Sequence, residues 1–142
     1  RGMFVQVLYN MHGQPKVEGT MPFTDVKKSD WYYDAVLWAY QNKVTAGVSD
    51  TKFAPMHDVT REQTAVLLEK YTAANGKDTS ARGDLSQYSD ADSISAWAKD
   101  AVAWAVANKI MVGTDTGKLL PGSNASRAQA AQIMVSYRNT VK

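Results

Sequence analysis

Two arginines stand where a binding site for an acidic group is most readily built. Arg61 follows Thr60 and Arg127 follows Ser126, and each hydroxyl residue is predicted to cap the start of a helix. A cation in the first turn opposes the helix dipole, at a cost of about a few tenths to 1 kcal/mol. A guanidinium beside unpaired first-turn N–H groups can instead grip a carboxylate through two parallel hydrogen bonds. We therefore expect Arg61 and Arg127 to bind acidic groups of a ligand.

A structural role for these arginines is the alternative. In that case each guanidinium pairs with a carboxylate of the protein, such as Asp25 or Asp90, across the boundary between neighbouring repeats. Arg1 aligns with Arg61 at an offset of 60 and joins the candidate ligand-binding residues.

Aromatic and glycine positions complete the candidate ligand-binding set. Trp31 and Trp97 open predicted helices beside a loop, where a ring can offer a face to a sugar, although packing is the favoured role for both. Gly47 and Gly113 follow those helices. Each glycine either ends a helix with a positive φ or lets a ligand reach bare backbone, and the sequence does not favour one role over the other.

Other kinds of site find little support. His12 and His57 have no second ligand at helical spacing and the chain has no cysteine, so we expect no metal and no cofactor. The sequence contains no Gly-rich phosphate-binding loop, no Ser-His-Asp triad order and no convincing pair of catalytic carboxylates. We therefore predict that the chain is not an enzyme. With 16 basic and 14 acidic side chains, the charge is too balanced to favour nucleic acid. No apolar run approaches the length of about 18 residues needed for membrane insertion.

The candidate positions recur because the sequence repeats itself. When Trp31 to Tyr71 is laid on Trp97 to Tyr137, roughly 15 of 41 positions are identical, as expected of tandem modules. The pairs, all 66 residues apart, include Trp31 and Trp97, Trp38 and Trp104, Gly47 and Gly113, Pro55 and Pro121, Arg61 and Arg127, and Tyr71 and Tyr137.

Each repeat is expected to hold two helices joined by a loop. An apolar stripe from Trp31 to Asn42 predicts a first helix that ends near Gly47, and the same pattern recurs 66 residues later. Trp38 and Trp104 lie mid-stripe and are predicted to be core residues. The capping boxes at 60–63 and 126–129 predict the start of the second helices. The fold class is therefore all-α, with the loops adding at most a short extended pair.

The order of these motifs resembles the S-layer homology (SLH) module. It is carried by Phe23-Thr-Asp-Val26, Trp31, Ala35-Val36, Asn42-Lys-Val44, Gly47, Phe53-x-Pro55 and Thr60-Arg-Glu-Gln63, and a second time by Tyr88-Ser-Asp-Ala91 and Trp97 through Ser126-Arg-Ala-Gln129. Residues 1 to 9 resemble the closing helix of a module whose front half is absent. We accordingly expect the chain to be part of something longer.

This resemblance implies a domain organisation and a fold. The expected parts are a closing helix at 1–13, a linker at 14–22, a module at 23–74, a linker at 75–84 and a module at 85–142. Family modules come in threes and form a helical pseudo-threefold spindle. Residues 1 to 11 are therefore expected either to dock as a lone helix or to recruit a second chain, and docking is favoured because their apolar side chains would otherwise stay exposed.

The resemblance also implies a function, that of a non-catalytic anchor on the extracellular bacterial surface. In the family, the arginine of a Thr-Arg-Ala-Glu motif meets the pyruvyl ketal of an acidic polysaccharide linked to peptidoglycan, in grooves between modules. Here Gln63 and Gln129 replace the usual Glu. The alternative is a structural module that joins subunits of a surface lattice, including other SLH modules, beside an upstream enzyme or adhesin.

Overall fold

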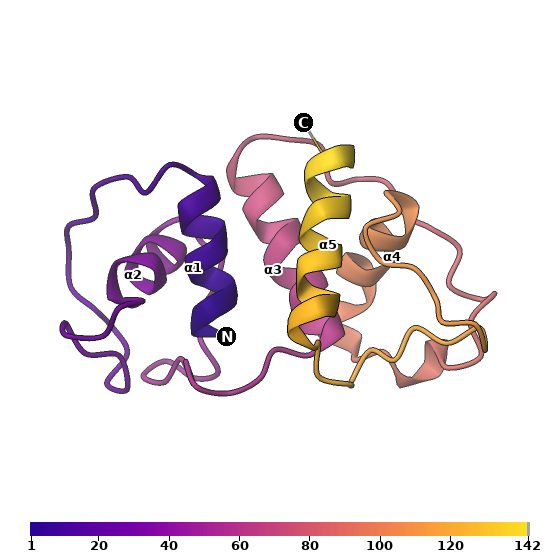
Figure 1. Cartoon of the computed structure of the whole chain (residues 1–142), viewed down its shortest axis with the longest axis horizontal. Helices are drawn as coiled ribbons and strands as arrows, with labels where there is room; N and C mark the ends of the chain where they lie inside the picture. The colour runs from indigo at the N-terminus through magenta and orange to yellow at the C-terminus, as the bar shows by residue number, and fades with distance from the viewer. Residues whose placement is uncertain (142) are drawn as a thin grey trace. The chain divides into compact units, whose positions relative to one another are not determined.

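The computed structural model describes residues 1–141, and these residues are helical with irregular connections (Figure 1). The helices are α1 (Gly2–Met11), α2 (Tyr33–Gln41), α3 (Arg61–Ala74), α4 (Lys99–Ala107) and α5 (Arg127–Thr140), with short 3-10 helices η1 (Ala91–Ser93) and η2 (Ala96–Ala98). One isolated antiparallel bridge joins Thr60 and Asn124 within the described range. The all-α prediction is confirmed.

The chain divides into two compact units, Arg1–Asp58 and Val59–Lys142. In the first unit α1 packs on α2, and in the second unit α3 packs on α4 and η2 (Figure 1). Each unit therefore joins the closing helix of one sequence module to the front half of the next. Helix α1 thus packs on α2 of the same chain, which is the docked arrangement expected for residues 1 to 11.

Equivalent apolar residues build the two cores. Val5, Leu8, Val36, Val44 and Phe53 are fully enclosed in the first unit. The second unit encloses Leu68, Val102, Trp104 and Leu119. Burial of such side chains contributes about 1.5 to 3 kcal/mol each, which accounts for a repeat that conserves apolar character between its copies. Trp38 is buried like Trp104, as predicted.

Helix α5 joins the second unit through Tyr137. The Tyr137 ring lies 6.3 Å from the ring of Tyr71 on α3 and 6.5 Å from that of Trp104 on α4. Its hydroxyl is 2.8 Å from the hydroxyl of Thr72 on α3, and this hydrogen bond is buried. A buried hydroxyl with a partner avoids the free-energy cost of desolvation, so Tyr137 fixes α5 on α3 without a polar penalty.

The first helix of each repeat ends earlier than predicted. α2 stops at Gln41 and α4 at Ala107, not near Gly47 and Gly113. Lys43 takes the left-handed conformation with φ 60°, the Lys43 N–H bonds the carbonyl of residue 40, and the next N–H bonds that of residue 39. This is the Schellman pattern, and Lys109 repeats it at φ 58°. The prediction failed because a lysine fills the position that glycine usually occupies.

The first helices also begin later than predicted. α2 starts at Tyr33, so Trp31 lies in the turn before it. Trp97 lies in η2, and α4 starts at Lys99. Neither tryptophan belongs to the apolar stripe of the α-helix that follows, and this changes what their side chains can contact.

Candidate functional site

Arg61 of α3 and Asp90 of the second module hold one loop peptide of that module from two sides. The Nε of Arg61 donates to the carbonyl of Leu119 at 2.8 Å. The carboxylate of Asp90 accepts the N–H of Leu119 at 2.9 Å and the N–H of Leu120 at 2.8 Å. Leu120 has a φ of 53°, a conformation that costs a residue with a side chain about 1 to 2 kcal/mol. The three hydrogen bonds hold this strained turn closed.

The first unit contains the same arrangement. The Nε of Arg1 donates to the carbonyl of Phe53 at 2.9 Å. Asp25 accepts the N–H groups of Phe53 and Ala54 at 2.9 and 2.8 Å, and Ala54 has a φ of 59°. We call each set of an arginine, an aspartate and two loop residues an Arg–loop–Asp latch. In both latches the arginine and the aspartate contact one peptide segment, which differs from the direct ion pair considered as the alternative.

First-turn N–H groups of these helices are already bonded to the same loops. The N–H of Gly2 donates to the carbonyl of Pro55 and the N–H of Glu62 to that of Pro121, both at 3.0 Å. The N–H of Arg61 bonds the carbonyl of Ser123 at 3.0 Å. The expectation that unpaired first-turn N–H groups help to build an anion site is therefore wrong for α3, because the following loop satisfies them.

The guanidinium of Arg61 nevertheless keeps one edge open. Its Nε and Nη2 lie on one side, and Nη2 donates to the carbonyl of Val112 at 3.2 Å. Among the described residues Nη1 has no hydrogen-bond partner, and it is not among the fully buried atoms. The edge formed by Nη1 and the second hydrogen of Nη2 is free for a planar carboxylate. Arg61 is only 8% exposed, and this burial lowers its pKa. The negative charge of Asp90 opposes that shift.

The other two candidate arginines are more exposed. Arg1 is partly buried, and its guanidinium carbon lies 4.9 Å from the centre of the Phe53 ring. Burial lowers the pKa of Arg1, against the charge of Asp25. Arg127 is exposed at the start of α5, whereas Arg61 at the equivalent position of α3 is buried.

Trp31 and Trp97 are both on the surface. Trp31 is 66% exposed and Trp97 is 62% exposed, so the favoured prediction that they pack is wrong. The reason is that both lie before the regular α-helix and so outside its buried apolar stripe. Trp31 makes an edge contact with Tyr32 at 5.0 Å between ring centres. Each ring leaves apolar surface available to a ligand.

Gly47 and Gly113 both lie under an aromatic ring of their own module. A Cβ on Gly47 would lie 2.4 Å from the Phe23 ring, and one on Gly113 would lie 2.6 Å from the Tyr88 ring. Gly47 also has a φ of 83°. Neither glycine caps a helix, so that part of the prediction is wrong, although Gly47 does adopt the expected positive φ. Close packing by a ring is common to both residues.

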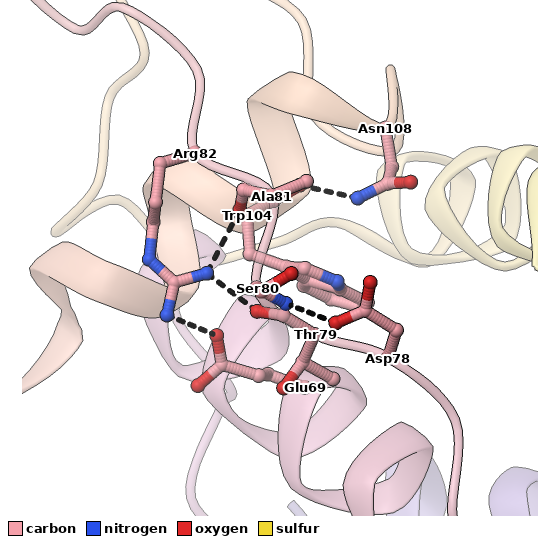
Figure 2. A network of polar contacts seen from close by, with 8 residues as sticks. All are labelled: Glu69, Asp78, Thr79, Ser80, Ala81, Arg82, Trp104 and Asn108. Atoms are coloured by element: carbon pink, nitrogen blue, oxygen red, sulfur yellow. Dashed lines mark hydrogen bonds and ion pairs between the residues drawn. The ribbon is translucent and has the colours of Figure 1, made fainter.

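The linker between the modules is bound to the second unit (Figure 2). Arg82 approaches Glu69 of α3, with 3.8 Å between Nη2 and Oε2, and donates to the carbonyls of Thr79 and Ala81. The N–H of Gly83 bonds the carbonyl of Ala103 on α4 at 2.8 Å. The segment therefore closes over α3 and α4. Burial raises the pKa of Glu69, and Arg82 partly offsets this.

Sequence reasoning identified Asp25 and Asp90 only as possible ion-pair partners. Their function as acceptors of two loop N–H groups was missed, as were the loop residues themselves. A signal was available, because both aspartates follow an aromatic-hydroxyl pair, Phe23-Thr24 and Tyr88-Ser89. A short repeated motif of that kind, ahead of a predicted helix, indicates a side chain that binds backbone.

Comparison with known proteins identifies what the repeat resembles. The model of the family described as "S-layer homology domain" matches residues 22–65 and 87–131. The chain is 38% identical over 111 residues to the surface-layer 125 kDa protein of Lysinibacillus sphaericus, which is 78% of this chain and 9% of that protein. It is 30% identical over 134 residues to an endoglucanase of Bacillus sp. (strain KSM-635), 94% of this chain and 14% of the relative.

A third relative is an amylopullulanase of Thermoanaerobacterium thermosulfurigenes, 37% identical over 114 residues, 79% of this chain and 6% of the relative. The chain thus spans only a small part of each of these proteins. No helix in the described part of the chain is long and apolar enough to cross a membrane, and no group of three or more candidate ligands for a metal ion occurs there.

We predict that Asp90→Asn destabilises the protein. An amide side chain can accept only one of the two N–H groups and turns a donor toward the other, so the free energy of unfolding should fall by about 1 to 3 kcal/mol. Burial raises the pKa of Asp90, but the N–H groups of Leu119 and Leu120 help to bring it below the ordinary value of 3.8. The contribution of the Asp90 carboxylate to the free energy of unfolding is therefore complete above about pH 4 and is lost as the pH falls further.

Urea unfolding followed by circular dichroism at pH 7 and pH 3 measures both effects. The difference between wild type and Asp90→Asn should narrow at the lower pH. Asp92→Asn, which removes an exposed carboxylate two residues away, is the matched control and should leave stability within about 0.5 kcal/mol. Equal stability of Asp90→Asn and Asp92→Asn at pH 7 would contradict the latch.

Proposed function

Because the chain belongs to the S-layer homology domain family and is an extracellular cell-surface module, we propose that it is a non-catalytic anchor that binds an acidic polysaccharide of the cell wall. The polymer is a secondary cell-wall polysaccharide linked to peptidoglycan. Its acidic group is a carboxylate, such as the one that a pyruvyl ketal carries. In this proposal the enzymes and surface proteins that share the module owe their attachment to it, and the catalytic parts lie elsewhere in them.

The single observation that carries this proposal is the open edge of Arg61. The latch uses Nε, and Nη2 donates one hydrogen to the carbonyl of Val112, so the guanidinium is held in place before any ligand arrives. A side chain that is already ordered loses little conformational entropy on binding, which favours affinity. The remaining edge has the spacing of a bidentate contact with a carboxylate.

The two capping boxes support the same reading. The Oε1 of Gln63 accepts the N–H of Thr60, and the Oε1 of Gln129 accepts the N–H of Ser126, both at 2.9 Å. Glutamine thus keeps the helix start that the family's glutamate would make, without adding a negative charge beside the arginine. The first turn of α5 therefore contains no acidic residue and that of α3 contains only Glu62, which limits the negative charge near both arginines.

The remaining candidate residues belong to the same proposal with different contributions. Arg1 and Arg127 are assigned to carboxylate binding at equivalent helix starts, and the exposed rings of Trp31 and Trp97 to contacts with the sugars. The two glycines are assigned an indirect contribution, since they let Phe23 and Tyr88 pack closely against the loops that the latches hold.

Binding to isolated cell walls tests this function. Purified sacculi of Lysinibacillus sphaericus should retain the protein in a pull-down, and sacculi stripped of secondary polymer by acid should lose most of that retention. Pure pyruvylated polymer added in solution should compete with intact sacculi for the protein and lower the retained fraction. Equal retention by intact and stripped sacculi would contradict polymer binding and favour the alternative, a module that holds subunits of a surface lattice together.

We predict that Arg61→Ala weakens binding to intact sacculi by about 10- to 100-fold, the effect of losing one charged contact worth about 1.5 to 3 kcal/mol. The same variant loses two hydrogen bonds to loop carbonyls, so its stability should also fall by about 1 to 3 kcal/mol. Binding is therefore measured well below the melting temperature of the variant, which circular dichroism provides.

Two further variants separate the charge from the fold. Arg61→Lys keeps a positive charge but has no planar fork, so we expect weakened binding with a smaller loss of stability. Arg138→Ala removes an exposed cation from the last turn of α5 and serves as the matched control, with binding and stability unchanged. A folded Arg61→Ala that binds intact sacculi as well as wild type would show that Arg61 is purely structural.

A further inference from the structure

Glu62 directs its carboxylate away from its own helix. It occupies the second position of α3, is only 6% exposed, and bonds a residue of the next module. Its Oε2 accepts the N–H of Ser95 at 2.9 Å, and its Oε1 accepts the hydroxyl of Ser95 at 2.6 Å. Both carboxylate oxygens therefore hold one residue, and hydrogen bonds to a charged acceptor are about twice as strong as neutral ones.

Ser95 stands at the base of the exposed tryptophan. It is the residue before η2, which contains Trp97, and η2 packs against α3. The backbone that carries the Trp97 ring is thus fixed to the first turn of α3, one residue from Arg61. A largely exposed tryptophan gains little from burial, so an ordered support beneath it indicates a ring prepared for contact with something else.

The first unit supports its exposed tryptophan by a different means. Gly2 occupies the position on α1 that Glu62 occupies on α3, so no carboxylate is available there. The turn before Trp31 is closed locally instead, where the Oδ2 of Asp30 accepts the N–H of Lys27 at 2.8 Å. The bond from α3 to η2 is therefore specific to the second unit.

We propose that Glu62 is a positioning residue that holds Trp97 as a stacking platform for a pyranose ring of the cell-wall polymer. This inference rests on the proposed function and adds a sugar subsite to it. Because Arg61 and Glu62 both lie in the first turn of α3, we assign the ring at Trp97 to the same polymer chain that carries the acidic group at Arg61. Ser95 donates hydrogen bonds to both oxygens of Glu62, so this carboxylate is directed at Ser95 and forms no ion pair with Arg61.

The hold on Trp97 can be measured without any ligand. In a Trp31→Phe background the remaining tryptophans other than Trp97 are buried, so rapid depolarisation of tryptophan fluorescence reports motion of Trp97. Glu62→Ala and Ser95→Ala should both increase the fast component and the quenching by acrylamide. Glu62→Gln, which keeps an acceptor for one Ser95 donor, should give an intermediate value. Asp30→Ala, the matched change in the first unit, should have no effect on Trp97.

Binding to intact Lysinibacillus sphaericus sacculi tests the subsite itself. Trp97→Ala should weaken retention by about 3- to 10-fold, and Glu62→Ala and Ser95→Ala should each cause part of that loss. Combining either of these changes with Trp97→Ala should lower retention no further than Trp97→Ala does by itself. If Trp97 stays rigid in Glu62→Ala, the positioning role is overturned.

A wild-type protein that binds only polymer-bearing sacculi, together with a Trp97→Ala variant that binds them equally well, would refute this inference alone. Equal binding of wild type to intact and stripped sacculi would refute the proposed function, and the sugar subsite with it. The two failures are therefore distinguishable in one set of measurements.

Discussion

The structure depends on one interaction, the closure of a loop peptide between an arginine and an aspartate that come from different sequence modules. In the second unit Arg61 bonds the carbonyl of Leu119 while Asp90 bonds the N–H groups on either side of it. The left-handed residue that follows is strained, and it persists only because both sides are held. The latch therefore joins the closing helix of one module to the front half of the next, and this explains why the compact units do not coincide with the repeats.

The same interaction resolves the apparent conflict between the helix dipole and the arginine. A cation at a helix start is unfavourable by itself, but the carbonyls of Leu119 and Val112 and the charge of Asp90 surround Arg61 with negative potential. One edge of the guanidinium thus has a structural role. In the proposed function the other edge binds the ligand, so the structural and the ligand-binding interpretations of Arg61 are compatible in a single side chain.

Local signals in the sequence predicted local features well. The capping boxes placed Arg61 and Arg127 as the first residues of α3 and α5, because the hydrogen bonds of a cap lie within four residues. The ends of α2 and α4 were misplaced because Lys43 and Lys109 adopt a conformation for which glycine is the usual signal. Trp31 and Trp97 were misread because their spacing continues the helical stripe although the regular helix has not begun. The latch joins residues 58 apart, Arg61 and Leu119, and no local pattern encodes that distance.

The central claim is that Arg61 uses one edge for the latch and offers the other to a carboxylate, and NMR of the arginine side chains tests it most directly. In ¹⁵N-labelled protein the Nε–H of Arg61 should be protected and should scarcely shift when soluble polymer fragments released from Lysinibacillus sphaericus sacculi are added. Its Nη resonances should shift and exchange more slowly with water in the same titration. A titration in which the Nε–H loses its protection while the Nη groups stay unchanged would show that the ligand competes with the latch, and would contradict the account.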